Sequence, residues 1–400
     1  MSKSFSIYPL AGIDNASPDD DRLQVGGDAR RNYLRDAVNV DITDTGRVRM
    51  RKGRRKVSDL ALSDLWQSPL HGDVFGRLGE QWVRVDPQDW STEALATIGP
   101  GPVSHLVLNG QVLAAGSAGI WQFDGRQARR LALDVPPAPL VSASDGGSGA
   151  LEAGSYGVAV AWLRGAQESP LSAMTSCTVA AAGALSITLP MCMDPTVTHA
   201  RLYLTRHNGG ELLRGEDYPI GTAWAAWTLL PTLGAPAPFR HMQPMPTGQY
   251  LGLWRGRLVT AWANVLRFSE ALAYHVNDPL HGFVQMPQRI TFVQPVDGGI
   301  WVGQVDHVAF LAGAEPAELV LSHKTGKAPV PGSAVALDAE TAGELSAGGA
   351  AAVAWLAANG FVLGSPDGQL LQPQARRIRG ITGNRATSIV FGSRLLAAVT

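Results

Sequence analysis

The chain has 400 residues, enough for two or three ordinary domains, and its 45% apolar and 17% charged residues are typical of a globular protein. The formal net charge of −1 argues against a generally basic nucleic-acid binder. No window approaches about 18 uninterrupted apolar residues, and the N-terminus lacks the apolar stretch of a secretory signal, so the sequence predicts no membrane anchor.

Residues 1–60 form a leader with an unusual charge distribution. Within it, AVNVDI and RVRMR alternate apolar and polar residues on either side of Asp44-Thr45-Gly46, which predicts a strand–turn–strand unit. Lys and Arg far outnumber Asp between positions 30 and 56. The leader is therefore a strongly positive segment in a nearly neutral chain.

The leader arginines are the candidate binding residues of the chain. Alternation along a strand places side chains on one face, so a row of guanidinium groups could meet phosphates or acidic groups of another subunit. A solvated strand face, or pairing with Asp19, Asp20 and Asp21, explains the same pattern. The candidate residues are Arg47, Arg49, Arg51, Arg54 and Arg55.

Residues 61–134 and 241–400 consist of short apolar strands separated by Gly, Asn and Asp turns. The clearest block is 105–125, and similar blocks start roughly 35 to 60 residues apart later in the chain, near the period of a propeller blade. The best helix candidate is 341–358, although its Gly-rich middle weakens a helix. The later blocks are 249–270, 290–313, 352–373 and 388–399.

Residues 135–240 have a different pattern, entered through the linker 135–147 and left through the Pro-rich 230–246. Core alternation at Tyr156, Val158, Val160 and Trp162, with hairpin loops at regular spacing, predicts about seven short strands. The expected fold class is therefore all-β: a β-propeller-like body with an inserted immunoglobulin-like or fibronectin type III-like β-sandwich.

Side chains that commonly carry chemistry are scattered. The nine His show no metal-ligand spacing, and the sequence contains no nucleophile elbow, phosphate-binding loop or dinucleotide fingerprint, so we expect no cofactor and no enzymatic activity. Cys177 and Cys192 are expected to be free thiols in a core. Most of the eleven Trp are expected in cores; Trp90, near Asp86 and Asp89, is the best candidate for sugar stacking.

Several motifs together resemble the tail nozzle, or tail-hub (packaged-DNA stabilisation), proteins of short-tailed bacteriophages. The leader sequence RRNYLRDAVNVDITDTGRVRMRKGRRKV is similar to the opening of that family. The Glu-Ser-Pro loop at 168–170 and the Arg-x-Tyr-x-Thr strand at 201–205, before a Gly-Gly hairpin, are similar to its inserted domain. The sequences WRGRL at 254–258 and RFSE at 267–270, followed by Tyr274-His275, resemble the next blade.

This resemblance implies a virion structural protein, assembled in the host cytoplasm, that forms a homo-oligomeric ring in the tail. The ring would most often be a hexamer, contact adaptor, tube or fibre proteins, and surround the channel through which the genome leaves. Two other readings stay open: a glycan-binding or receptor-binding propeller at a tail tip, and a baseplate component of a long-tailed phage. A propeller hydrolase ranks last, because the sequence offers no cluster of acids.

Overall fold

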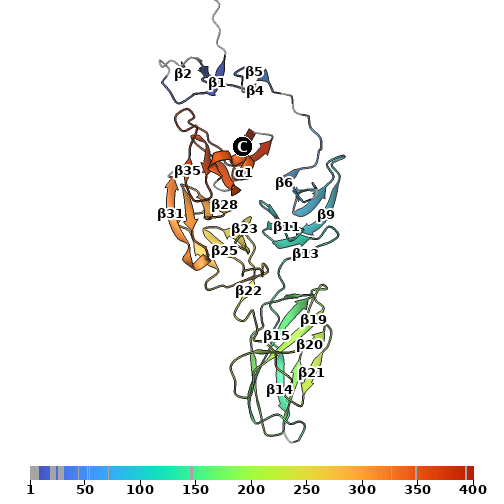
Figure 1. The fold of residues 1–400 in the computed structure, drawn as a ribbon. Helices are drawn as coiled ribbons and strands as arrows, with labels where there is room; N and C mark the ends of the chain where they lie inside the picture. Colours follow the sequence, from blue (N-terminus) through green and yellow to red (C-terminus); the bar gives the residue numbers. More distant parts are fainter. Residues whose placement is uncertain are drawn as a thin grey trace, which may run out of the picture.

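In a computed structural model, the protein is almost entirely β-structure arranged in three bodies (Figure 1). The structure describes residues 9–18, 24–25, 31–43, 45–51, 53, 55–70, 72–144, 147–325, 327–346, 349–391 and 394–400. Small leader sheets lie at one end, a ring of β-sheets lies in the middle, and a separate β-sandwich extends from the other end (Figure 1). The expected fold class is confirmed.

The leader folds into two small sheets. One is three-stranded in the order β1-β3-β2, with β1 parallel to β3, and the other is the antiparallel pair β4-β5. The bounds are β1 Leu10–Ile13, β2 Gln24–Val25, β3 Arg31–Leu34, β4 Val40–Ile42 and β5 Val48–Met50.

The middle body contains five four-stranded antiparallel sheets among the described residues, here called blades one to five. Blade one is β6 Leu62–Gln67, β7 Val74–Leu78, β8 Gln81–Val85 and β9 Thr92–Thr97. Blade two is β10 Ser104–Leu108, β11 Gln111–Gly116, β12 Gly119–Phe123 and β13 Ala128–Arg130. Blade three is β23 Gln249–Trp254, β24 Arg257–Trp262, β25 Val265–Phe268 and β27 Phe283–Gln285.

Blade four is β28 Ile290–Val296, β29 Gly299–Gln304, β30 Val308–Ala312 and β31 Val320–Thr325. Blade five is β32 Val335–Leu337, β33 Ala352–Ala357, β34 Gly360–Gly364 and β35 Leu370–Leu371. The pair β22 Gln243–Pro244 and β26 Val276–Asn277 lies beside blade three. The helical elements are η1 Pro316–Glu318, α1 Ala339–Ala342 and η2 Gly343–Leu345.

Apolar clusters between consecutive blades hold the body together. Trp82 of blade one packs with Phe123 of blade two, and Trp301 of blade four packs on Trp355 of blade five, with ring centroids 5.4 Å apart. Middle strands such as β29 and β33 are buried along their whole length because neighbouring blades cover both faces. This explains why their sequences are continuous apolar runs rather than strict alternations.

After blade five the chain ends in one two-stranded hairpin, β36 Ala386–Phe391 and β37 Arg394–Val399. Just before it, the Arg385 guanidinium donates to the Asp64 carboxylate, whose side chain is nearly inaccessible and also bonds Arg77. Asp64 lies at a bulge in β6. An ion pair between residues 321 positions apart therefore joins the last segment of the body to blade one.

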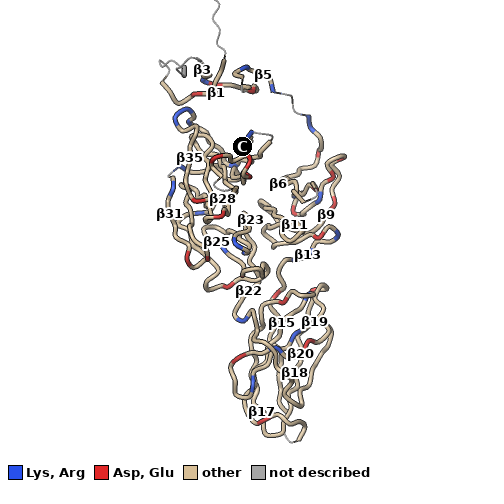
Figure 2. The backbone as a smooth tube through the Cα atoms, in the orientation of Figure 1, with Lys and Arg blue, Asp and Glu red and all other residues tan. Residues whose placement is uncertain are grey.

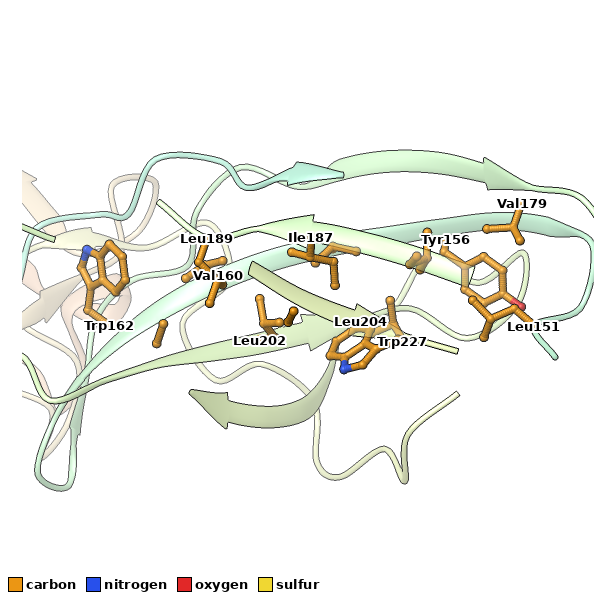
Figure 3. Close-up of a cluster of buried hydrophobic side chains, with 14 of the residues drawn as sticks. Leu151, Tyr156, Val160, Trp162, Val179, Ile187, Leu189, Leu202, Leu204 and Trp227 are labelled. Carbon is orange, nitrogen blue, oxygen red and sulfur yellow. The ribbon is translucent and has the colours of Figure 1, made fainter. Parts of the chain in front are cut away.

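The sandwich consists of two sheets made by eight strands, one more than expected. One sheet has the order β14-β18-β21; the other has β16-β15-β19-β20, with β17 paired to β15. Tyr156, Val160 and Trp162 line its core, as the alternation predicted (Figure 3). The bounds are β14 Leu140–Ser144, β15 Gly154–Arg164, β16 Gln167–Glu168, β17 Thr175–Val179, β18 Ala184–Thr188, β19 His199–Leu204, β20 Leu213–Pro219 and β21 Trp224–Trp227.

The helix expected over 341–358 is wrong for most of its length. The single α-helix of the described chain covers Ala339–Ala342, where the Asp338 carboxylate caps it by accepting from the Thr341 amide. Residues Ala352–Ala357 form the central strand of blade five instead. Burial on both faces outweighs the helix preference of a sequence rich in alanine.

Candidate functional site

The leader hairpin β4–β5 forms as the alternation predicted. Asp41 is the cross-strand partner of Arg49, and Ile42 is the partner of Val48. The hairpin therefore has an apolar face formed by Val40, Ile42, Val48 and Met50, and a charged face on the other side.

The candidate arginines occupy the charged face or the segment beyond it. Arg47, Arg49 and Arg55 are exposed, and the Arg51 Nε donates to Asp41 Oδ1 at 2.7 Å within the same hairpin. Arg54 lies outside the described residues. Residues 19–21, the expected acidic partners of the leader arginines, also lie outside them. Figure 2 shows the basic residues of this segment along the chain that runs from β5 toward β6.

The first leader sheet is attached to the loop that follows blade five. The Asn15 Oδ1 accepts from the Arg379 amide at 2.9 Å, and the Arg377 guanidinium stacks over the Tyr33 ring at 4.4 Å. A cleft of about 340 Å³ between this loop and β4 is lined by Ile42 and Ile378, among others. The leader is therefore packed against its own body: Arg51 and Asp41 line the cleft, whereas Arg47 and Arg49 are exposed.

The junction between sandwich and body is built from motif residues. The Glu168 carboxylate accepts from Arg201 at 2.6 Å and from the Tyr203 hydroxyl, and Arg201 also binds Asp217 in a bidentate pair. Burial, followed by the bond to Glu168, raises the pKa of Tyr203 above its usual value. The Glu-Ser-Pro loop and the Arg-x-Tyr-x-Thr strand are thus two halves of one buried polar network.

The same network reaches the propeller-like body. The His275 Nε2 donates to the backbone carbonyl of Glu168 at 2.8 Å, and the His275 ring packs edge-on against Phe239. Burial lowers the pKa of His275, so the neutral ring is favoured. On the other side of the junction, Arg164 donates to the carbonyls of Arg130 and Leu131 at 2.8 and 2.9 Å. These contacts couple the sandwich to blades two and three.

The two sequences of the third motif, WRGRL and RFSE, also contact each other. Arg257, from the sequence WRGRL, donates to Glu270 of RFSE at 3.4 Å and to Glu315 at 2.9 Å. The turn before it uses Arg255 and Gly256 at φ 46° and 73°, the left-handed pair that a tight hairpin needs. The residues that carry the resemblance therefore make structural contacts. The sequence alone did not predict that these residues contact one another.

The outer face of the sandwich exposes large apolar side chains. Leu140, Thr188 and Trp224 are successive cross-strand neighbours on β14, β18 and β21. Leu140 is 71% exposed and Trp224 64% exposed, and Met191 follows shortly after β18 with 83% exposure. Leu140 and Trp224, on either side of Thr188, are here called the apolar row. Exposed apolar side chains grouped in this way are typical of protein interaction surfaces.

The body has a shallow pocket of about 430 Å³ between blades three and four. Tyr250, Trp262, Asn264 and Arg289 line it, together with two glutamines. Trp262 is 55% exposed at the end of β24, and burial raises the pKa of Tyr250. An exposed aromatic ring beside amides and a guanidinium is suited to a polar ligand with an apolar face.

The other expected residues take ordinary structural places. Trp82, Trp162, Trp227, Trp254, Trp301 and Trp355 are buried, as expected of core Trp residues. Trp90 is half-buried at φ 63°, and the Asp86 and Asp89 carboxylates accept from turn amides at 2.8 Å. Cys177 and Cys192 are free and half-buried against the sandwich core.

The described residues contain neither a metal-binding cluster nor a membrane-spanning helix. No group of three or more His, Cys, Asp or Glu is placed to hold a metal ion in the part of the chain that the structure describes. Among the same residues, no helix is long and apolar enough to cross a membrane.

Comparison with protein-family models gives no match, and comparison with curated proteins gives none. Among solved structures, BamB from Moraxella catarrhalis is 12% identical with a TM-score of 0.34, covering 90% of this chain and 87% of that chain. Sqt1 from Saccharomyces cerevisiae is 11% identical with a TM-score of 0.29, covering 79% and 74%. The N-terminal domain of Nup159 is 10% identical with a TM-score of 0.30, covering 84% and 72%. All three are β-propeller proteins.

Proposed function

We propose that this chain is a structural component of a bacteriophage tail, which assembles into a ring, a nozzle or hub, around the DNA-exit channel. The apolar row on the sandwich is the observation that carries the proposal. Leu140 and Trp224 are mostly exposed on the outer face of a sheet, each directly across from Thr188. Burial against a neighbouring copy or an adaptor, tube or fibre protein supplies the missing contact.

The motif residues support a mechanical role without catalysis. Glu168, Arg201 and His275 are used in the junction, where they fix the sandwich relative to the body. A rigid two-body subunit can transmit an assembly geometry from one contact surface to another. In the proposed ring, most often a hexamer, the sandwich and the body would contact different neighbours.

The test is oligomer mass and shape for the full chain. Size-exclusion chromatography with light scattering and negative-stain electron microscopy should show a ring. A double variant, Leu140→Ser with Trp224→Ser, should shift the population toward smaller species while keeping the melting temperature. Trp227→Ala is the matched buried control on the same strand, since Trp227 is 4% exposed and its loss should lower stability. A chain that stays monomeric at high micromolar concentration, and binds no tail protein, overturns the proposal.

Transient contact with the genome is a second part of the proposal. Arg47, Arg49 and Arg55 are exposed in a chain of nearly neutral net charge, so copies arranged in a ring would concentrate positive charge at their leaders. Binding through phosphates alone is independent of sequence and falls steeply with salt. Fluorescence anisotropy with duplex DNA at several salt concentrations measures this directly.

The pocket beside Trp262 favours a second candidate function, that of a glycan-binding propeller at a tail tip. An exposed indole can stack on a sugar face, while Arg289 and Asn264 can bind its hydroxyl groups. A glycan array with the wild type and Trp262→Ala tests it. Equal signals for both proteins, or no signal at all, remove this function.

A further inference from the structure

The C-terminal hairpin β36–β37 has half the strands of each complete blade. One face, with Ala386, Val390, Leu395 and Ala397, packs against blade five and the segment around α1. On the opposite face Ile389 is directly across from Leu396, and the two are 52% and 40% exposed. Phe391, two residues further along the same face, is 71% exposed.

Two features mark this hairpin as an acceptor for further strands. In the described chain β37 pairs with β36 alone, so its outer edge presents unpaired backbone groups. Glu340 and Glu344 are exposed on the segment whose Ala342 packs into the same cluster as Leu395. An acceptor with an open edge, apolar side chains and nearby carboxylates selects a basic, partly apolar β-ribbon.

The leader hairpin β4–β5 has those properties. Its strands pair with no other strand of the described chain, although the Gly46 carbonyl accepts from the Leu10 amide and Ile42 lines the cleft on its own body; a two-stranded sheet gains stability from further pairing. Met50 is 81% exposed on its apolar face, and Arg47 and Arg49 are exposed on the other face. The two hairpins together have four strands, the number in every complete blade.

We propose that the leader hairpin of one copy adds to the β37 edge of a neighbouring copy and completes a sixth blade there. The inference rests on the proposed ring and names the contact that closes it. Arg47 and Arg49 then lie near Glu340 and Glu344 of the acceptor, so that within the ring Arg55, rather than these two, is left to contact DNA. A neighbour is favoured as the partner because Asn15 and Tyr33 fix the first leader sheet on its own body, while Met50, Arg47 and Arg49 of the hairpin stay exposed to another copy. Head-to-tail contacts of this kind generate rings.

Disulfide trapping between two different chains tests the donor directly. In a Cys177→Ser and Cys192→Ser background, one protein carries Met50→Cys and the other Leu396→Cys. Mixed and oxidised, they should give a cross-linked heterodimer that reduction reverses. Leu272→Cys, a site on blade three that is more exposed than Leu396 (77% against 40%), replaces Leu396→Cys in the control mixture and should give at least about tenfold less product.

Two further outcomes distinguish a failure of this hairpin contact from a failure of the proposed ring. If rings form but the mixture gives only background cross-linking, the proposal is overturned and the ring stands. If a single chain with both cysteines cross-links internally at high dilution, its own leader is the occupant and the proposal is again overturned. As an independent measurement, Glu340→Arg with Glu344→Arg should weaken association roughly 3- to 10-fold, and Arg47→Glu with Arg49→Glu on the donor should restore it.

Discussion

Acid destabilisation through His105 is the prediction that the structure supports most quantitatively. The His105 ring stacks on Trp66, with centroids 5.3 Å apart and an interplanar angle of 4°, and packs near Phe75 and Trp82. Its Nε2 atom is buried and has no hydrogen-bond partner. Burial lowers the pKa of His105 from 6.5 to about 4, although nearby Asp64 acts in the opposite direction.

The loss of stability in acid follows from the linkage between protonation and folding. Between pH 6.5 and about 4 the unfolded chain binds a proton at this position while the folded chain does not, so acid stabilises the unfolded state. One pH unit of pKa difference corresponds to about 1.4 kcal/mol, which gives a maximum loss of roughly 3 kcal/mol. Stability is unaffected by His105 above pH 6.5, and the full loss is reached below pH 4.

His105→Phe keeps an aromatic ring in the stack and removes the titrating group. Urea unfolding from pH 7.5 to 4.0 should show the variant losing less stability than the wild type, with the two curves separating below pH 6.5. His199→Phe, at an exposed histidine, is the control and should follow the wild type. Parallel curves for His105→Phe and wild type across the whole range would refute the reasoning.

Three further perturbations test the junction, the blades and the leader. Glu168→Gln removes a buried carboxylate that accepts two side-chain hydrogen bonds, and should lower the free energy of unfolding by about 1–3 kcal/mol in urea titrations. Trp355→Ala should cost about 3–5 kcal/mol by the same measurement, whereas the exposed Trp262→Ala should cost under about 0.5 kcal/mol. Arg55→Ser should reduce the slope of log affinity for DNA against log salt by about 1, measured by fluorescence anisotropy.

Local patterns allowed much of the fold to be predicted. The Asn109-Gly110 pair takes φ values of 50° and 71° between β10 and β11, as an Asn-Gly hairpin requires, and the leader alternation gave β4 and β5. The helix error arose because an Ala-rich run has the same composition whether it is exposed or enclosed between blades. Only the arrangement of neighbouring blades makes residues 352–357 a buried strand.

The contacts that organise the molecule could not be predicted, because they join distant positions. Glu168 and His275 are 107 residues apart, and Asp64 and Arg385 are 321 apart. The residues that flank each of these positions in the sequence carry no signal that would predict the long-range contact. The motif resemblance marked Glu168 and His275, yet it gave neither their contact nor the direction of any side chain.

The position of the sandwich has a consequence for how the chain folds. Blades two and three contact each other through β10 and β23, although the whole sandwich separates them in sequence. An unfolded insert would be a long flexible loop whose closure opposes that contact. Once folded, the insert no longer acts as a long flexible loop, and its exit is held on the sandwich itself, as the Leu171 amide bonded to the Phe239 carbonyl illustrates. We therefore expect early collapse of the insert to act as a template that brings the two halves of the ring into register.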